Sequence, residues 1–478
     1  MQQSNDTIVI GGGISGLTAA WRLNRAGRRV LLLEASLRIG GAIQTTRRDG
    51  FLLEHGPFNV LVRSAEFRRM LHDLRDTLPI VRADREVARN RFVMSGGKLH
   101  RAPAGPGDLL FNSLLSPPAT LRMLRGLLIS RPRRDDRETL DMVARRRLGD
   151  RFADTLASAL SVGIFGAEST DIEFSSCVPR IARIDRNARS PLLAMLRAKH
   201  DAHESEKIRG LVSFEEGLAA LPRTLADELG DSVCMDSPVK SITRQNDGSW
   251  GVQCARREEP TVLTADNIVL AVGHEAAAKM LGPIDDELSG IIGSVSGSSM
   301  LVLNLGFRRE QVRHPLNGYG LLAAGSERTC PYLGVLWASS VFPHHAPAGY
   351  CVMRVFRGGS RHPGCVEMSD AENVDAVMDN LRETLQITGD PALIHICRWP
   401  NAIPLYAPGH GEKIRRANEI ADRIGGLYLA GNYTDGISIG SCVERGDRIA
   451  HQILALSPRA IESNQTGVRQ SSPTMVAQ

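Results

Sequence analysis

A glycine-rich turn between two short apolar runs constrains the fold of this chain more than any other feature. Residues 7–10 (TIVI) are β-branched and apolar, GGGISG follows directly, and LTAAWRLNRAG then has the composition of a helix. A second apolar run, VLLLE, ends at Glu34. The order strand, glycine turn, helix, strand predicts a βαβ unit with two parallel strands. The unit therefore predicts an α/β fold of the Rossmann type.

Each glycine of this turn has a separate physical role. Gly11 permits the tight turn out of the strand, Gly13 lets the backbone approach a pyrophosphate, and Gly16 allows helix and strand to pack closely. The helix N-terminus offers free N–H groups and the positive end of its dipole to phosphates. Glu34 can accept hydrogen bonds from the two ribose hydroxyls, and it would repel a 2′-phosphate. The unit therefore predicts a dinucleotide site that disfavours NADP.

The residues after Glu34 help to distinguish between dinucleotides. The segment EASLRIGGAIQT places Arg38 and the pair Gly40-Gly41 directly after the acid. Small residues there would let a second stretch of backbone pass close to the cofactor, and Arg38 could meet a phosphate. No second GxGxxG motif occurs in the chain, so a separate NAD(P)H site is not expected. The pattern favours an oxidase or desaturase over a reductase supplied by NADPH.

Charge balance and cysteine spacing bear on the expected partners. Lys and Arg total 58 against 53 Asp and Glu, a net charge of +5, without a dense basic and aromatic stripe. Nucleic acid is therefore not an expected partner, whereas an anionic small substrate or an anionic membrane surface suits the excess. None of the eight cysteines forms a CxxC pair, so no metal site is predicted. The thiols are expected to be reduced and mostly buried.

Neither the N-terminus nor the apolar runs predict a targeting signal. The chain enters a strand almost at once, which predicts no signal peptide, and the absence of a run of about 18 apolar residues predicts no membrane span. Residues 458–478 are polar and aperiodic and are predicted to be disordered.

The middle of the chain changes from helical to strand-like patterns. Residues 61–209 have helical periodicity, and ATLRMLRGLLIS (119–130) places Arg122 and Arg125 between apolar residues, after a break at two prolines. Such a helix could rest on a membrane surface or bury one face in the core, and burial is favoured. Residues 215–230 predict a loop and an amphipathic helix, and VKSITR, SWGVQCA and ADNIVLAVG then predict a β-meander.

The C-terminal half adds a second group of strands and a final helix. SSMLVLNLGF, YLGVLWASSVF and YCVMRVFRGG, within 296–360, are predicted to be strands that wall a substrate cavity. Residues 399–410 predict a proline-broken loop carrying Trp399 and Tyr406. LYLAGNYTDGISIGS then predicts a strand, a small-residue turn and a helix over about 442–454, whose N-terminus is aimed at a polar ligand.

Segments along nearly the whole chain resemble the protoporphyrinogen oxidase family of the flavin amine oxidase superfamily. They are IVIGGGISGLTAAWRL, EASLRIGGAIQT, LEHGPF, NRFVMSGGKLHRAP, EEGLAALPRTLA, LGVLWASSVFPHHAP, AIPLYAPGH and GNYTDGISIGSCVERG. The first two are shared across the superfamily, whereas NRFVMSGGKLHRAP, SSVFP, IPLYAPGH and GISIG are more specific to this branch. The resemblance implies non-covalently bound FAD.

The resemblance also assigns roles to individual residues of the cofactor site. The pyrophosphate would be cradled by Gly11, Gly12, Gly13, Ile14, Ser15 and Gly16. The ribose and phosphates would be met by Glu34, Ala35, Arg38 and Gly41. Adenine and the isoalloxazine would be lined by Val239, Gly56, Pro57, Phe58 and Trp399. The pyrimidine end, where backbone amides stabilise the charge of the reduced flavin, would be formed by Ile437, Ser438 and Ile439. Gly431 and Asn432, which turn the chain before them, would also contact the cofactor.

For the substrate, the resemblance implies Arg91 and Gly163. Arginine suits a carboxylate because its planar fork donates two hydrogen bonds at once. Gly163 would keep a close-approach role in SVGIFGAEST, where the match to the family is loose. His55 could act as a general base, although a neutral structural histidine beside a turn is the favoured interpretation. No catalytic side chain is predicted beyond the flavin chemistry.

The implied reaction is the oxidation of protoporphyrinogen IX to protoporphyrin IX by oxygen, in haem biosynthesis. Coproporphyrinogen III as substrate stays open. So does another superfamily enzyme, although an amine oxidase is weakened by the presence of only 6 Tyr and 4 Trp. A flavin-fold binding protein without turnover is disfavoured by the intact glycine turns. The expected location is cytoplasmic with contact to the inner face of the membrane, and both a monomer and a homodimer remain open.

These expectations imply three domains and a tail. The FAD-binding domain would be discontinuous, over 5–60, 210–290 and 400–457. A mixed-sheet substrate domain would comprise 61–90 and 291–399. A mostly helical domain that faces the substrate or the membrane would comprise 91–209, before the tail.

Overall fold

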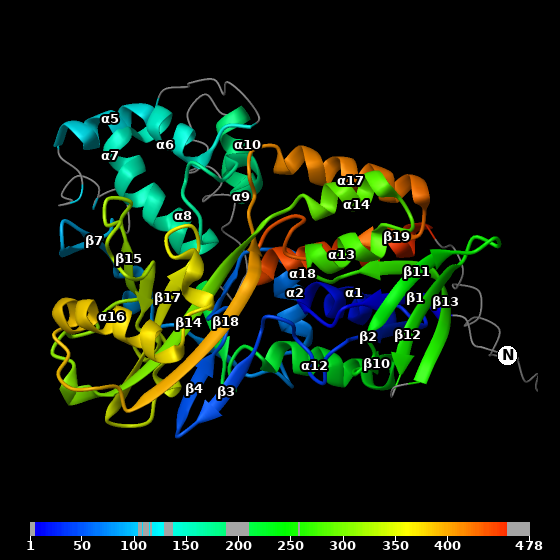
Figure 1. Cartoon of the computed structure of the whole chain (residues 1–478), viewed down its shortest axis with the longest axis horizontal. Coiled ribbons are helices and arrows are strands. Elements are labelled where there is room, and N and C mark those ends of the chain that lie inside the picture. Colours follow the sequence, from blue (N-terminus) through cyan, green and yellow to red (C-terminus); the bar gives the residue numbers. More distant parts are fainter. Residues whose placement is uncertain are drawn as a thin grey trace, which may run out of the picture.

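Two large sheets and a helical part make up the described portion of the molecule. The structure is a computed structural model that describes residues 5–103, 108, 114, 117–128, 137–187, 210–256 and 259–456. In Figure 1 the sheet that contains the N-terminal strand lies on the right, the second sheet on the left, and the helical part above it. The α/β fold class predicted from the sequence is confirmed.

The first sheet has seven strands in the order β10-β2-β1-β13-β12-β11, and β19 pairs with β13 beyond this path. The pairs of β1 with β2 and β13, of β2 with β10, and of β13 with β19 are parallel, and the β11–β13 meander is antiparallel. Its strands are β1 (Asn5–Ile10), β2 (Val30–Leu33), β10 (Val233–Cys234), β11 (Val239–Arg244), β12 (Trp250–Arg256), β13 (Glu259–Leu270) and β19 (Leu427–Leu429).

Alternate residues of β1 pack in two separate hydrophobic cores, because successive side chains of a strand point to opposite faces. Val9 packs with α1, α2, α12 and α18 on one face, whereas Ile8 and Ile10 pack with α13, α14 and α17 on the other. These helices are α1 (Ile14–Arg25), α2 (Ala65–Asp73), α12 (Ala220–Leu229), α18 (Ile439–Leu456), α13 (His274–Leu281), α14 (Asp286–Gly293) and α17 (His410–Ile424). The predicted βαβ unit, meander and final helix are all confirmed.

The second sheet has the order β18-β14-β17-β16-β15-β7-β8 and is antiparallel except for the β15–β7 pair. One face packs on α16 (Asp370–Leu385). Its strands are β7 (Arg91–Ser95), β8 (Lys98–Arg101), β14 (Gly297–Arg308), β15 (Gly320–Ala323), β16 (Gly334–Leu336), β17 (Tyr350–Gly358) and β18 (Leu393–Pro404). Thus β7 and β8 lie within the range 91–209 that the sequence assigned to the helical part.

Two predictions in this region are wrong. Residues 399–404 are not a loop but the second half of β18, which tolerates its prolines because it is an edge strand with a free side. The run YLGVLWASSVF is a strand only at Gly334–Leu336, and α15 (Ala338–Val341) follows. Trp337, Ala338, Val341 and Phe342 are buried, and this spacing of one, four and five residues is that of a helix, because a strand would alternate buried and exposed residues.

The helical part comprises α5 (Pro117–Leu128), α6 (Leu140–Leu148), α7 (Asp150–Phe152), the π-helical turn η1 (Ala153–Ala157), α8 (Ser158–Phe165), α9 (Phe174–Cys177) and α10 (Pro179–Asn187). The two prolines of α5 stand at its start, where their missing N–H groups cost nothing. The predicted disordered tail lies outside the described residues. No helix in the described ranges is long and apolar enough to cross a membrane.

Two small sheets connect the larger ones. One pairs β3 (Thr45–Arg48) with β4 (Phe51–Glu54), and the other has the order β5-β9-β6. The remaining elements are β5 (Val60–Val62), β6 (Ile80–Arg82), β9 (Gly210–Phe214), α3 (Arg85–Arg89), η2 (Gly230–Ser232), η3 (Arg309–Gln311), η4 (Pro343–His345) and η5 (Pro363–Val366). All eight cysteines are free thiols, and seven of them are buried.

Candidate functional site

The glycine turn after β1 has the geometry that its predicted roles require. Gly11 has φ +108°, and a Cβ on Gly11 or Gly16 would lie 2.4 Å from the Ala271 carbonyl oxygen or 2.2 Å from that of Gly11. Glycine is therefore enforced at both positions. A Cβ on Gly13, by contrast, would meet nothing within 4 Å. Gly13 is thus the glycine that faces open space in front of α1.

The first turn of α1 lies against the first two turns of α18. A Cβ on Gly446 of α18 would be 2.4 Å from the carbonyl oxygen of Ser15, and the Ser15 side chain hydrogen-bonds Cys442. Neither helix has an acidic residue in its first turn. Ser438 caps α18 by accepting a 3.1 Å hydrogen bond from the Ser441 amide. Two positive helix ends, from opposite ends of the chain, therefore adjoin in one place.

The acid at the end of β2 ties the glycine turn to the segment that follows it. The Gly12 amide donates to Glu34 Oε2 at 2.7 Å, and the Ser36 amide and hydroxyl donate to Oε1. Arg38 donates to the Gly41 carbonyl at 2.9 Å, and Ala35 is exposed. Glu34 thus already orders the loop by accepting three hydrogen bonds, and it keeps about one lone-pair site for a ligand.

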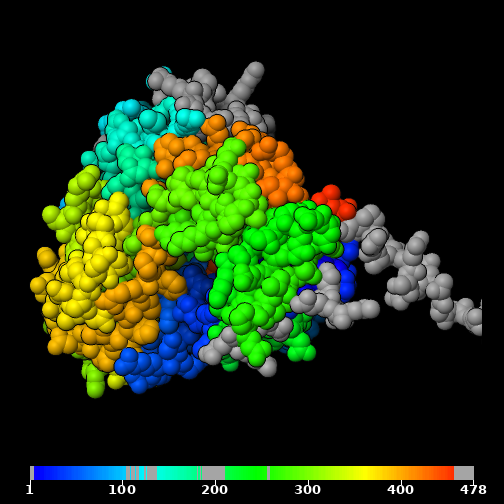
Figure 2. All heavy atoms as spheres, turned by 45° about the vertical axis from the view of Figure 1, so that its right-hand side comes forward, coloured from blue at the N-terminus to red at the C-terminus, as the bar shows by residue number. Residues whose placement is uncertain are grey.

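A second group of predicted residues lies between the two sheets. The Trp399 indole N–H donates to the His55 carbonyl oxygen at 2.8 Å. A Cβ on Gly56 would lie 2.5 Å from the Ala42 carbonyl and 3.7 Å from the Trp399 ring, so only glycine fits there. Phe58 is buried, and Pro57 is half-buried. Figure 2 shows a hollow between the N-terminal strands, drawn in blue, and the neighbouring orange and green segments.

Sequence reasoning missed a polar row that crosses three strands of the second sheet. Asn304 of β14 pairs with Arg354 of β17 on one side and with His395 of β18 on the other, so the three side chains share one face. That face carries the segment with Gly56, since Arg354 donates to the carbonyls of Glu54 at 3.1 Å and Gly56 at 2.7 Å. In the sequence, the feature that could have indicated this polar row was the lone arginine inside the apolar run YCVMRVF.

Arg354 and Glu54 are both fully enclosed at this junction. Burial lowers the pKa of Arg354 to about 10, which keeps it protonated at neutral pH. Burial raises the pKa of Glu54 to about 7, against hydrogen bonds from the Leu218 amide and the Thr45 hydroxyl that lower it. The guanidinium lies over the rings of Phe58 and Phe356 at 5.3 and 5.2 Å. The junction is therefore a cationic, low-dielectric wall.

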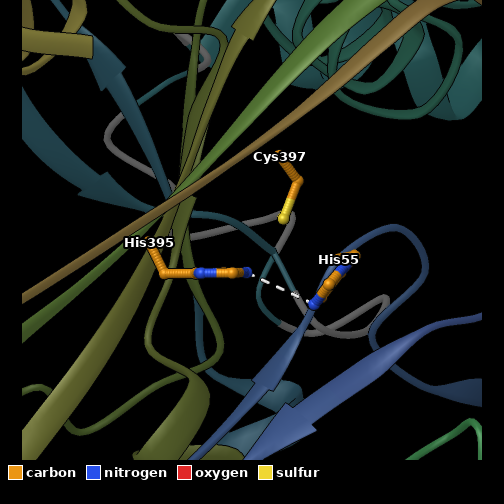
Figure 3. Close-up of side chains that lie close together, drawn as sticks. All are labelled: His55, His395 and Cys397. Atoms are coloured by element: carbon orange, nitrogen blue, oxygen red, sulfur yellow. Dashed lines mark hydrogen bonds between the residues drawn. The ribbon is translucent and has the colours of Figure 1, made fainter. Parts of the chain in front are cut away.

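A histidine pair closes the edge of this wall (Figure 3). The Nε2 atoms of His55 and His395 are 3.3 Å apart, and His55 Nε2 is 2.8 Å from the Thr46 hydroxyl. Burial, and next the charge of His395, lowers the pKa of His55 to about 4, so the ring is neutral at pH 7. The Cys397 thiol lies beside the pair. Spacing did not predict this cluster, because its members come from separate sheets.

The two residues expected to meet the substrate lie apart from the glycine turn. Arg91 begins β7, is exposed, and places its guanidinium 4.9 Å above the ring of Tyr319. The Tyr319 hydroxyl accepts a 2.7 Å hydrogen bond from Asn59, next to Phe58. A Cβ on Gly163 of α8 would lie 2.5 Å from Leu322 of β15, so this glycine permits close packing of helix on strand.

The remaining predicted residues lie around the ends of β11 and β19. Val239 begins β11, and the nearby Ser237 amide donates to the Glu34 carbonyl at 2.9 Å. Gly431 has φ +141°. Asn432 donates to the Ala402 carbonyl at 3.0 Å. At the start of α18, Ile437 is half-buried, Ser438 is exposed and Ile439 is buried.

Comparison with known proteins gives this arrangement a family. Residues 14–454 match the family model described as flavin containing amine oxidoreductase. The chain belongs to this family. Within it, the chain is 31% identical to protoporphyrinogen oxidase of Bos taurus, over 95% of this chain and 99% of the relative. It is 25% identical to coproporphyrinogen III oxidase of Bacillus subtilis (strain 168), over 92% and 96%.

A solved structure extends the comparison to the fold. The putative protoporphyrinogen oxidase from Exiguobacterium sp. 255-15 matches with a TM-score of 0.78 and 25% identity, over 96% of this chain and 100% of that chain. The chain is therefore a flavin-dependent oxidoreductase of the protoporphyrinogen oxidase family.

The residues of the site fit the flavin that this family uses. Open space in front of Gly13 adjoins two helix N-termini that have no acidic residue in their first turns, an environment that suits a phosphate. The tight contacts of Gly56 with Ala42 and Trp399 bring backbone and an aromatic ring to the same wall. The family membership and the geometry therefore agree on the class of cofactor.

Proposed function

We propose that this protein oxidises protoporphyrinogen IX to protoporphyrin IX, with non-covalently bound FAD as cofactor and oxygen as the final acceptor, in haem biosynthesis. The observation that carries the proposal is the meeting of α1 and α18 at their N-termini, beside the wall formed by Gly56 and Trp399. The names of the relatives supply the substrate class.

The choice of FAD over a smaller flavin rests on the N-terminal unit. Gly13 and the start of α1 suit a pyrophosphate, and Glu34 suits the ribose of an adenosine at the end of β2. Val239 would contact the adenine, since Ser237 holds its segment against Glu34. When bound, FAD supplies the hydride acceptor and returns the electrons to oxygen as peroxide.

The protein's own contribution is to position the substrate and to exclude water. Arg91 would bind a carboxylate of the substrate through its planar fork, and Tyr319 holds that guanidinium over its ring. The buried rings of Phe58 and Phe342, 5.4 Å apart between centroids, keep the adjoining interior apolar. A substrate held in this way reacts as if in one molecule with the cofactor, which lowers the entropic part of the barrier.

No side chain is assigned as the base that takes the pyrrole proton. His55 is neutral, but a pKa of about 4 makes it a weak proton acceptor at neutral pH. A substrate nitrogen or solvent is the better carrier, and this agrees with the sequence-based preference for a structural His55.

Coproporphyrinogen III is the second candidate substrate. The similarity to the Bacillus enzyme, over 92% of this chain, favours it. The two porphyrinogens differ in their number of carboxylates, so the discrimination would depend on the cationic groups near the substrate rather than on the cofactor site.

The experiment that tests the proposal follows porphyrin fluorescence after each chemically reduced porphyrinogen is mixed with the purified flavoprotein under air. We expect porphyrin and peroxide to form with protoporphyrinogen faster than in a flavin-free control. Faster turnover of coproporphyrinogen would select the second candidate, and silence with both would reject the proposal.

Contact with a membrane surface is proposed through the helical part, in a cytoplasmic protein. Several large apolar side chains of this part are exposed, among them Leu121 at 70% and Ile164 at 50%. Arg122 and Arg125 flank Leu121 and would meet anionic headgroups. We expect co-sedimentation with anionic vesicles that is lost at high salt and in Leu121→Asp; equal sedimentation of that variant would contradict this contact.

A further inference from the structure

The histidine pair and the neighbouring thiol of Figure 3 have the composition of a metal site. His55 lies at the end of β4, whereas His395 and Cys397 lie two residues apart on β18 and share one face. One ligand atom of each residue lies within 4.8 Å of the other two. Imidazole nitrogen and thiolate sulfur are the ligands of zinc and of univalent copper.

The spacing of the two imidazoles fits shared coordination better than direct hydrogen bonding. Their Nε2 atoms are 3.3 Å apart, which exceeds the usual length of an N–H hydrogen bond, about 2.9–3.0 Å. Two nitrogens bound to one tetrahedral ion at about 2.05 Å would be separated by about 3.3 Å. A movement of the Cys397 sulfur and displacement of the Thr46 hydroxyl, which lies 2.8 Å from His55 Nε2, would complete three ligands.

The backbone holds the three residues in place without any metal. The His55 amide donates to the Gln44 carbonyl at 2.9 Å, and its carbonyl accepts from Trp399 at 2.8 Å. His395 and Cys397 are fixed by their pairing with Asn304 and Val302 of β14. A pre-positioned set of ligands binds a metal with little loss of conformational entropy.

The surrounding charges select the kind of ion. The guanidinium groups of Arg38, Arg48 and Arg354 act electrostatically on members of the cluster. Burial raises the pKa of the Cys397 thiol to about 11, against the charge of Arg354, so metal binding releases the thiol proton to solvent. The nearby positive charges oppose a second unit of charge on the metal. Two neutral imidazoles, one thiolate and a univalent ion sum to zero, whereas a divalent ion leaves one positive charge.

We propose that His55, His395 and Cys397 bind one thiophilic closed-shell cation, with Cu⁺ favoured over Zn²⁺, and that this ion joins the edge strand β18 to the end of β4. The site goes beyond the oxidation reaction and does not depend on it. No sequence spacing indicated it, because the two histidines are 340 positions apart.

The test is an anaerobic competition for Cu⁺ between the untagged holoprotein and a chromophoric chelator that absorbs beyond the flavin band. We expect one equivalent of Cu⁺ per chain, at least tenfold weaker binding in His395→Ala and Cys397→Ser, and unchanged binding in the controls Cys351→Ser and His72→Gln. Cys351 is another buried thiol of the second sheet, and His72 is a histidine of α2.

A parallel titration with Co²⁺ and Zn²⁺ distinguishes the ions, since Co²⁺ in a tetrahedral site with a thiolate ligand has absorption beyond the flavin band. We expect Zn²⁺ to bind more weakly than Cu⁺ and to raise the melting temperature of the wild type but not of Cys397→Ser. Zn²⁺ binding as tight as Cu⁺ would overturn the assignment of the ion. Equal Cu⁺ uptake by the wild type and both ligand variants, or uptake only after removal of the flavin, would overturn the site itself.

Discussion

The two seven-stranded sheets place their functional groups in different ways. The first sheet is apolar along its strands, with Ile8, Val9 and Leu32 fully buried, and its polar chemistry lies in turns at the strand ends. The second sheet carries Asn304 and Arg354 in the middle of its strands, where each residue is only 1% exposed. The difference teaches that local turn chemistry builds one half of this site, whereas long-range strand pairing builds the other.

The largest effect should come from a negative charge at the turn of the first sheet. We expect Gly13→Asp to weaken FAD binding by at least about 100-fold, since like charges placed together cost several kcal/mol. The fold should be retained, because the added Cβ meets nothing within 4 Å and aspartate is a good N-cap. Equilibrium titration and the melting temperature of the flavin-free protein measure the two effects.

A matched control for this prediction exists on the other face of the same sheet. Gly273 is the N-cap of α13, and a Cβ there would also meet nothing within 4 Å. Gly273→Asp should leave FAD binding unchanged. Equal loss of flavin in both variants would mean that the start of α1 has no special role in FAD binding. It would contradict the claim that the turn chemistry of the first sheet builds the cofactor half of the site.

The next effect concerns a buried acid beside the second sheet. Because the pKa of Glu54 is raised to about 7, the folded state binds more protons than the unfolded state between about pH 4.5 and 7. The contribution of this group to stability therefore falls as pH rises through that window, by about 3 kcal/mol at most. We expect Glu54→Gln to gain melting temperature relative to the wild type between pH 5 and 8. Parallel pH profiles of the two proteins would contradict this account.

A smaller effect should follow from removal of the exposed cation at the start of β7. We expect Arg91→Ala to raise KM for the porphyrinogen about tenfold, equivalent to about 1.4 kcal/mol, with a small change in kcat. Arg313→Ala, another exposed arginine, serves as the control. A loss confined to kcat would show that Arg91 does not bind the substrate.

The smallest effect is expected at the histidine pair. His55→Gln should change the rate of porphyrin formation less than about threefold, and the wild-type rate should show no inflection from His55 between pH 6 and 9, because its pKa lies near 4. A rate that falls by orders of magnitude would make His55 a base and would move catalytic chemistry onto the second sheet.

The sequence predicts those parts of the molecule that depend on neighbouring residues. The turn at Gly11–Gly16, Glu34 at the end of β2 and the helix after Ser438 all follow from local spacing and side-chain size. The strand β18 was missed because its prolines resemble a loop, and they are tolerated only at the edge of a sheet.

The polar residues of the second sheet were missed because their roles depend on contacts between distant segments. The positions of Arg354 and His395 in the site depend on strand pairing with Asn304 and on contact with the residues after β4, hundreds of residues away in the chain. Periodicity within one segment contains no information about such pairing. The arginine inside an apolar strand was visible, but its partners were not.

The central claim is that the N-termini of α1 and α18 hold one dinucleotide flavin, and titration of the flavin-free protein with FAD and FMN tests it most directly. The account predicts one FAD per chain and binding of FMN weaker by at least about 100-fold, since FMN lacks the second phosphate and the ribose that Gly13 and Glu34 are placed to meet. Failure to take up FAD, or equal affinity for both flavins, would contradict it.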